Sequence, residues 1–192
     1  MSNLFQNNHE IIYFVYGEAF FVLGLAIALQ SRKHSRLALA RHLWLLAAFG
    51  IIHGVYEWGS VFIPLQQSFL AGESINFLRI MQMTLEAISF LALFQFGIEL
   101  LALESPVHIL IRGLPTVMLG IWEAVMLILQ SSNGQSFAGY FDTGDTLARY
   151  LLGVPGGVAA AWGLCRQAQQ VQRMRVPRIA NYLRGAAYAF VV

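Results

Sequence analysis

The stretch LARHLWLLAAFGIIHGVYEWGSVFI, residues 39–63, decides the fold class of this chain. It is long enough to cross a bilayer as one helix, because a transmembrane helix needs about 20 mostly apolar residues. The composition agrees, since hydrophobic residues make up 57% of the chain, charged residues only 11%, and the mean hydropathy is +0.60. Soluble domains carry charge on about a quarter of their residues. We therefore predict an all-α integral membrane helical bundle.

Further stretches of the sequence have the same character, giving five full transmembrane helices and a truncated sixth. We place the full spans at residues 11–29, 39–63, 75–103, 107–129 and 147–168, and the partial one at residues 179–192, within a single domain of residues 1–192. The run Pro155, Gly156 and Gly157 predicts a kink or a break in the fifth span. At 1.5 Å per residue the sixth span is about 20 Å long, short of the ~30 Å hydrocarbon core. We therefore expect the chain to be cut off inside a helix.

Basic residues predict the orientation of these spans. Lys and Arg gather around the first and fifth connections, whereas residues 65–74 and 131–146 contain neither. Because an excess of Lys and Arg marks cytoplasmic loops, the N-terminus is predicted to lie outside. We expect a multi-pass protein of the cytoplasmic (inner) membrane, surrounded by the lipid bilayer, and we do not expect nucleic acid as a partner.

Four glutamates and one histidine interrupt the apolar spans in their predicted outer half. An ionisable residue at the centre of a span costs about 2.5–3.5 kcal/mol on insertion scales, so each is a candidate functional residue. His53 and Glu57 are four residues apart and share one helix face. Carboxylates and imidazoles on facing helices can bind protons, a polar ligand or a divalent metal ion. We predict one buried site, with the same residues as metal ligands in the last case, formed by Glu18, His53, Glu57, Glu86 and Glu123.

Other roles for the polar residues stay open from the sequence. The acids can instead form structural ion pairs with Arg79 or Arg149, and Arg79 lies on nearly the same helix face as Glu86. A haem held by His42 and His108 near the inner surface is a further alternative, although both histidines also fit the cytoplasmic interface. The Glu-x-x-His motif of di-iron bundles is absent from the sequence, which weighs against a di-iron site.

The longest predicted loop is residues 131–145, which place Asp142 and Asp145 outside the membrane. We predict that this loop is a solvated connector. The sequence contains no phosphate-binding loop, dinucleotide fingerprint, serine-hydrolase elbow or zincin motif. An enzyme activity therefore has no positive support.

A family resemblance rests on residues 37–58, LALARHLWLLAAFGIIHGVYEW, within residues 20–58. The pattern LALARxLWLLAAFGxxHGxxEW, with His53-Gly54 and Glu57-Trp58 as its most distinctive part, resembles the N-terminal multi-span region of bacterial sensor histidine kinases and diguanylate cyclases. In such proteins the membrane region precedes a cytoplasmic transmitter module. The resemblance implies a sensory domain that forms a homodimer and acts through a transmitter module or a partner kinase.

The sequence lacks a phosphoacceptor helix, an ATP-binding domain and a cyclase domain, so we expect no enzyme activity in these 192 residues. Our first hypothesis is a signal-input domain in which a stimulus at the outer polar site shifts the helices. The alternatives are a metal-binding or proton-coupled transporter and a haem-binding membrane protein. A transport path has little sequence support, since Gln95 and Glu99 are exceptions in an otherwise apolar inner half.

Overall fold

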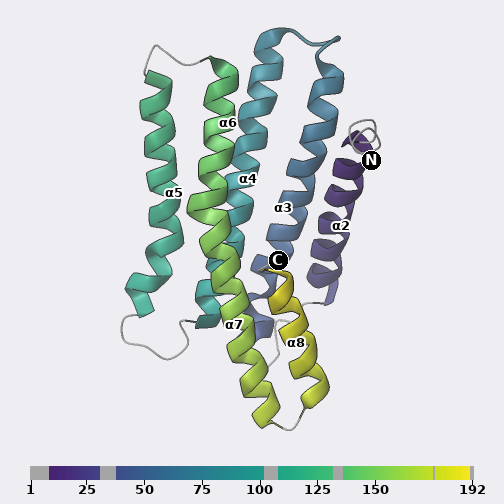
Figure 1. Cartoon of the computed structure of the whole chain (residues 1–192), viewed down its shortest axis with the longest axis vertical. Coiled ribbons are helices and arrows are strands. Elements are labelled where there is room, and N and C mark those ends of the chain that lie inside the picture. The colour runs from purple at the N-terminus through teal and green to yellow at the C-terminus, as the bar shows by residue number, and fades with distance from the viewer. Residues whose placement is uncertain (1–8, 31–37, 102–107, 132–135, 175, 191–192) are drawn as a thin grey trace, which may run out of the picture.

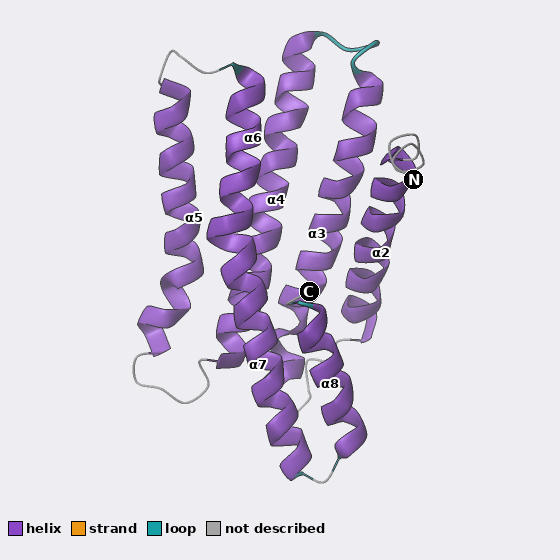
Figure 2. Ribbon diagram, in the orientation of Figure 1, coloured by secondary structure: helices purple, strands orange, loops and turns teal. Residues whose placement is uncertain are grey.

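The computed structural model describes residues 9–30, 38–101, 108–131, 136–174 and 176–190. Helices α2 (His9–Gln30), α3 (Ala38–Gln66), α4 (Gly72–Leu101) and α5 (His108–Ser131) run alternately in opposite directions (Figure 1). They are followed by α6 (Phe137–Ala148), the π-helical turn η1 (Arg149–Gly153), α7 (Val154–Arg173) and α8 (Pro177–Ala189). Figure 2 shows no strand in these parts of the chain. The predicted all-α fold class is confirmed.

Within the described residues, four helices are long and apolar enough to cross a membrane. They comprise Glu10–Gln30, Leu39–Gln66, Gly72–Leu101 and Ile111–Ser131, which match the first four predicted spans. Large apolar side chains stay exposed on α2 and α5, including Leu29 at 79% and Leu127 at 67%. Such exposed apolar surfaces are compatible with the hydrocarbon interior of a lipid bilayer. The chain therefore has the character of a membrane protein, while a fifth full span and the external N-terminus stay predictions.

Much of the predicted outer loop is helix. Residues Phe137–Ala148 form α6, so the prediction of a solvated connector over residues 131–145 is wrong from residue 137 onward. Ser136 caps the helix, because its hydroxyl accepts a 3.2 Å hydrogen bond from the Gly139 N–H. Residues 132–135 lie outside the described part of the chain.

Helix α6 continues through η1 into α7 without a break. The backbone at Arg149 is helical, with φ −61° and ψ −47°, and the Val154 N–H bonds to the Arg149 carbonyl, as in a π turn. Pro155 follows directly and cannot donate a backbone hydrogen bond to the preceding turn. The predicted irregularity therefore takes the form of a π turn just before Pro155.

Glycines bring neighbouring backbones into direct contact. A Cβ atom on Gly24 of α2 would lie 2.6 Å from the Ile51 nitrogen of α3. A Cβ atom on Gly97 of α4 would lie 2.4 Å from the Ala160 nitrogen of α7. Small residues permit such close helix packing inside a membrane. These contacts hold α2 along α3, and α7 along α4.

Two apolar clusters form the core around α4. One contains Phe49, Leu93 and Phe96 and joins α3, α4, α7 and α8. The other contains Trp122 and Leu152 and joins α4 to α5, α6, η1 and α7. Figure 1 shows that α7 and α8 form a hairpin extending beyond the end of α4. Helix α8 corresponds to the predicted sixth span, and its insertion in a membrane stays a prediction.

Candidate proton-binding site between α3, α4 and η1

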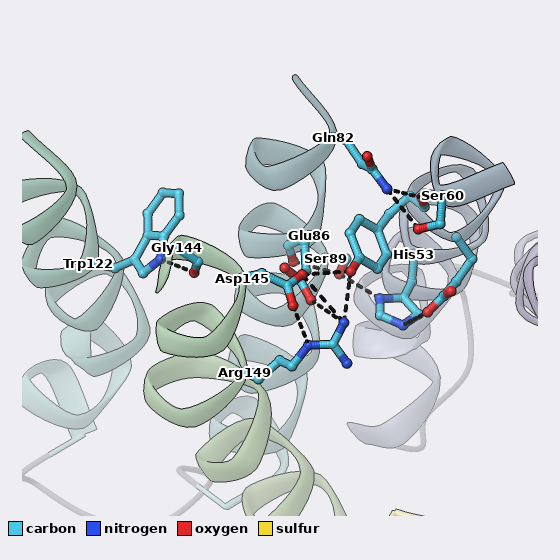
Figure 3. A network of polar contacts seen from close by, with 11 residues as sticks. His53, Ser60, Gln82, Glu86, Ser89, Trp122, Gly144, Asp145 and Arg149 are labelled. Atoms are coloured by element: carbon cyan, nitrogen blue, oxygen red, sulfur yellow. Dashed lines mark hydrogen bonds and ion pairs between the residues drawn. The ribbon is translucent and has the colours of Figure 1, made fainter. Parts of the chain in front are cut away.

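A network of polar side chains lies inside the bundle where α3, α4 and the α6–η1 junction meet (Figure 3). Arg149 Nη2 lies 3.1 Å from Glu86 Oε1, and Arg149 Nε lies 3.1 Å from Asp145 Oδ2. Arg149 also donates a 2.8 Å hydrogen bond to the Tyr56 hydroxyl, which donates one of 2.7 Å to Asp145 Oδ1. One cation therefore connects two carboxylates and a phenol from three parts of the fold.

The local sequence explains why these groups meet. Asp145 and Arg149 are four residues apart and share one helix face. That face can approach α4 because of Gly144, where a Cβ atom would lie 2.3 Å from Met83 Sδ. Trp122 of α5 donates a 2.9 Å hydrogen bond to the Gly144 carbonyl and so holds α6 from the other side. The missing side chain at residue 144 thus lets Arg149 reach the buried Glu86.

Gln82 joins α4 to α3 on the outer side of this network. Its Nε2 donates a 2.8 Å hydrogen bond to Ser60 Oγ and a 3.3 Å bond to the Tyr56 carbonyl. Polar contacts of this kind fix the register of two packed membrane helices. Tyr56 is consequently held at its backbone by Gln82 and at its hydroxyl by Asp145 and Arg149.

His53 extends the site along α3. Its Nδ1 lies 3.0 Å from Ser89 Oγ, and that hydroxyl donates its one hydrogen to the Glu86 carbonyl at 2.7 Å. Ser89 must therefore accept from His53, which assigns a proton to Nδ1. The other nitrogen, Nε2, lies 3.5 Å from Glu57 Oε1. A neutral His53 presents a lone pair to Glu57, so the two groups can hold one proton between them.

Aromatic rings surround the His53 imidazole. The ring centroids of Phe20, Phe49 and Phe90 lie 4.8, 5.2 and 5.3 Å from that of His53. His53 and Glu57 are only 5% and 4% exposed. The rings exclude water from the His53–Glu57 pair, and interactions between its charges are stronger in such apolar surroundings.

Negative groups in the site exceed its positive ones. Within the described residues, Glu57 Oε2 and both Glu86 carboxylate oxygens accept no hydrogen bond, so the Arg149–Glu86 contact is an ion pair by distance without hydrogen-bond alignment. Glu57, Glu86 and Asp145 together face one permanent cation, Arg149. Uncompensated charge in apolar surroundings is costly. The arrangement is therefore suited to bind a proton or a small cation.

The structure brings three of the five predicted site residues together, namely His53, Glu57 and Glu86. Glu18 and Glu123 are exposed. The structure does not bring these two residues to the polar network, because their neighbours occupy the inward face. Gly17 packs on Trp58, and Trp122 is only 5% exposed, so the adjacent acids point about 100° away around their helices.

The predicted metal ligands do not form a metal site as a set. No group of three or more His, Cys, Asp or Glu side chains in the described ranges is arranged to hold a metal ion. Arg149 lies against both Glu86 and Asp145, where a metal ion would need to approach them. Of the predicted haem ligands, His42 lies 3.9 Å from Glu99, and the side chain of His108 lies outside the described residues.

Tyr56, Ser89, Asp145 and Arg149 belong to the network but were not among the predicted site residues. Asp145 was assigned to the outer loop, although its four-residue spacing to Arg149 is a recognisable sign of a helical ion pair. The alternative that an acid pairs with Arg149 is confirmed. Arg79 instead lies over the Phe141 ring, 5.5 Å from its centroid.

A second polar cluster lies toward the opposite end of α4. Glu99 is 2.7 Å from Arg112 of α5 and 3.9 Å from His42 of α3, and it accepts a 3.1 Å hydrogen bond from Gln95. The apolar cluster around Phe96 lies between this group and the outer network along α4. The two polar regions are therefore separated by hydrophobic core.

Comparison with protein-family models, with curated proteins and with solved structures found no match for this chain. The resemblance of residues 37–58 to bacterial sensor regions thus stays a prediction. A functional proposal for this chain therefore rests on the geometry of the polar site.

Proposed function

We propose that this chain is the signal-input domain of a bacterial signal-transduction protein and that its stimulus is proton binding at the outer polar site. The proposal rests on the observation that Arg149 pairs with two carboxylates on different helices, Glu86 of α4 and Asp145 of α6. Neutralising one carboxylate changes which helices the cation holds together. The proposal includes a multi-pass protein of the cytoplasmic membrane, with an external N-terminus and α6–η1–α7 as a further span.

The two ion pairs of Arg149 respond differently to a movement of its helix. Asp145 lies on the same continuous helix as Arg149, so their contact moves with the helix and survives a shift. Glu86 lies on α4, so its contact resists any displacement between the two helices. Protonation of Glu86 removes this attraction and leaves Arg149 bound to Asp145 and Tyr56.

In the proposed mechanism, a proton reaches Glu86 along the side chain of Arg149. Glu86 is fully buried, but the Arg149 side chain that contacts it is 49% exposed. The site therefore connects with the surroundings of the bundle through Arg149. A stimulus that changes protonation there needs no opening of the hydrophobic core.

The output follows from the length of the helix that carries Arg149. Helix α7 runs from η1 to Arg173, in the part of the hairpin that extends beyond α4 (Figure 1). Helix shifts of about 1–2 Å at subunit interfaces are sufficient for switching. A shift at η1 would move the arginine-rich end of α7, where a transmitter module or a partner kinase of a homodimer would detect it.

The hydrophobic core favours sensing over transport. Phe49, Leu93 and Phe96 are 6%, 4% and 0% exposed, and they lie between the outer network and the Glu99 cluster. A transporter needs alternating access to its site from both sides of the membrane. A closed apolar layer supports a site that is loaded and emptied from one side.

Spin labels on α7 and α2 test the proposal. Cys165 is the single cysteine of the chain and is exposed on α7, so it can be labelled directly. A second label at Leu29→Cys uses an α2 residue that is 79% exposed. In the full chain reconstituted in lipid, we expect two distance populations whose ratio changes with pH. Glu86→Gln should hold the acid population at every pH.

The matched control is Glu123→Gln, which removes an exposed carboxylate of α5 and should leave the titration unchanged. A distance distribution that does not depend on pH would contradict the proposal. So would a Glu86→Gln variant that titrates like the unmodified chain.

A further inference from the structure

A polar cavity of about 230 Å³ lies between the end of α4 and the part of α7 beyond the core. It belongs to a different region of the fold from the outer polar network. Two arginines, three glutamines and two leucines line it: Leu100, Leu101, Arg166, Gln167, Gln169, Gln170 and Arg173. Among the described residues, this lining has two permanent positive charges and no carboxylate. The cavity is therefore suited to an anion.

The arginines lie on a common face of α7. Arg166, Gln170 and Arg173 follow one another at intervals of four and three residues, which places them along one side of a helix. An amide therefore lies between two guanidinium groups. Guanidinium groups bind phosphate oxygens through paired hydrogen bonds, and amide N–H groups add neutral donors.

The cavity has a partly fixed structure. Arg166 Nη1 donates a 3.3 Å hydrogen bond to the Leu101 carbonyl at the end of α4, which holds the guanidinium at the cavity while its other N–H groups stay available. Gln167 also lines the cavity and is only 4% exposed. A buried amide needs hydrogen-bond partners, and an oxyanion in the cavity would provide an acceptor.

We propose that this cavity binds a phosphate-type oxyanion, either the phosphodiester of an anionic lipid headgroup or the phosphate of a soluble molecule. The inference rests on the cavity lining and is independent of the proton-sensing function. The end of α4 lies where a membrane-spanning helix leaves the hydrocarbon, so headgroup phosphates are within reach of Arg166 and Arg173.

The test compares two probes with the full chain. In detergent, inorganic phosphate should raise the thermal unfolding midpoint above that in chloride at equal ionic strength. In nanodiscs, native mass spectrometry should detect retention of phosphatidylglycerol in preference to phosphatidylcholine. Selective retention of phosphatidylglycerol without an effect of phosphate identifies a lipid site, and the reverse result identifies a site for a soluble phosphate. Both support the proposal.

Single substitutions make the test specific. Arg173→Gln removes an exposed arginine of the cavity. It should weaken the binding of whichever probe binds the unmodified chain by about tenfold or more, as expected for a lost charge-assisted hydrogen bond. Arg173→Lys keeps the charge and should weaken it less. Arg178→Gln removes an exposed arginine of α8 that does not line the cavity, and it should bind like the unmodified chain. Absence of both effects, or equal losses in Arg173→Gln and Arg178→Gln, would overturn the proposal.

Discussion

The guanidinium of Arg149 and the carboxylate of Glu86 lie 3.1 Å apart although they belong to helices that are distant in the sequence. Glu86 is completely buried, whereas the Arg149 side chain is 49% exposed. The buried partner therefore depends on a cation that comes from the edge of the bundle. This asymmetry determines which substitutions the fold should tolerate.

Replacing Arg149 should be more harmful than replacing the other arginine in the outer half. Arg149→Gln leaves the buried Glu86 without its cation, and because Arg149 is itself half-exposed the expected loss is about 1–3 kcal/mol. Among the described residues, Arg79→Gln removes a cation–π contact with Phe141, worth about 0.5–1 kcal/mol. Unfolding of the reconstituted variants in denaturant measures both losses. Equal stabilities of the two variants would contradict the role of Arg149.

The combined variant Glu86→Leu, Asp145→Leu and Arg149→Met should recover much of the stability lost in Arg149→Gln. An apolar replacement of a complete buried ion pair is often neutral or stabilising, because no charge remains to be desolvated. Such a variant should fold but lose the pH-dependent distance change. Loss of stability together with loss of the response would indicate that the network is required for folding itself.

Gly144→Ala should weaken the site without altering any of its polar groups. The added methyl would overlap the ends of the Met83 and Met126 side chains, which would have to move within the packed core between α4, α5 and α6. Overpacking of this kind costs about 1–3 kcal/mol. The control is Gly120→Ala on α5, where a Cβ atom would meet nothing within 4 Å. Thermal unfolding should separate the two variants, and a neutral Gly144→Ala would refute the close contact.

The tautomer of His53 should depend on Ser89. Nitrogen NMR of histidine-labelled protein should show a proton on His53 Nδ1, because Ser89 donates its own hydrogen to the Glu86 carbonyl. Ser89→Ala removes the acceptor and should give a mixture of tautomers. The His42 signals should stay as they are, because His42 belongs to the Glu99 cluster. A proton on Nε2 of His53 in the unmodified chain would show that the assignment is wrong.

Removal of divalent metal ions should leave the protein as stable as before. The described residues contain no group of three metal-ligating side chains, and Arg149 occupies the region between Glu86 and Asp145. Thermal unfolding with a chelator, and again with added Zn²⁺, should give one midpoint for the unmodified chain and for His53→Ala. A zinc-dependent rise that His53→Ala abolishes would restore the metal hypothesis.

The long apolar helices could be predicted from the sequence because hydrocarbon thickness imposes their length whatever the helices pack against. The direction in which the acidic side chains of these helices point could not be predicted. Spans that are apolar on all sides have no polar stripe to mark the inward face. Glu86 and Glu123 consequently look alike in the sequence, although one is buried and the other is exposed.

Asp145 was harder to predict because its segment is polar and rich in glycine, which is typical of a loop. Tertiary packing, rather than local sequence preference, makes this segment helical. Gly144 packs closely against the ends of the Met83 and Met126 side chains, and Ser136 provides the helix cap. The spacing of Asp145 and Arg149 was the available sign, and it had meaning only once the segment was known to be helical.

The unbroken path from α6 through η1 to α7 has a thermodynamic consequence. One helix carries Asp145 and Arg149 near one end and Arg166 and Arg173 near the other. If the two proposed ligands favour different positions of this helix, each must change the affinity of the other by the same factor. The phosphate supply on one side of the membrane would then set the acidity at which the site on the other side takes up its proton.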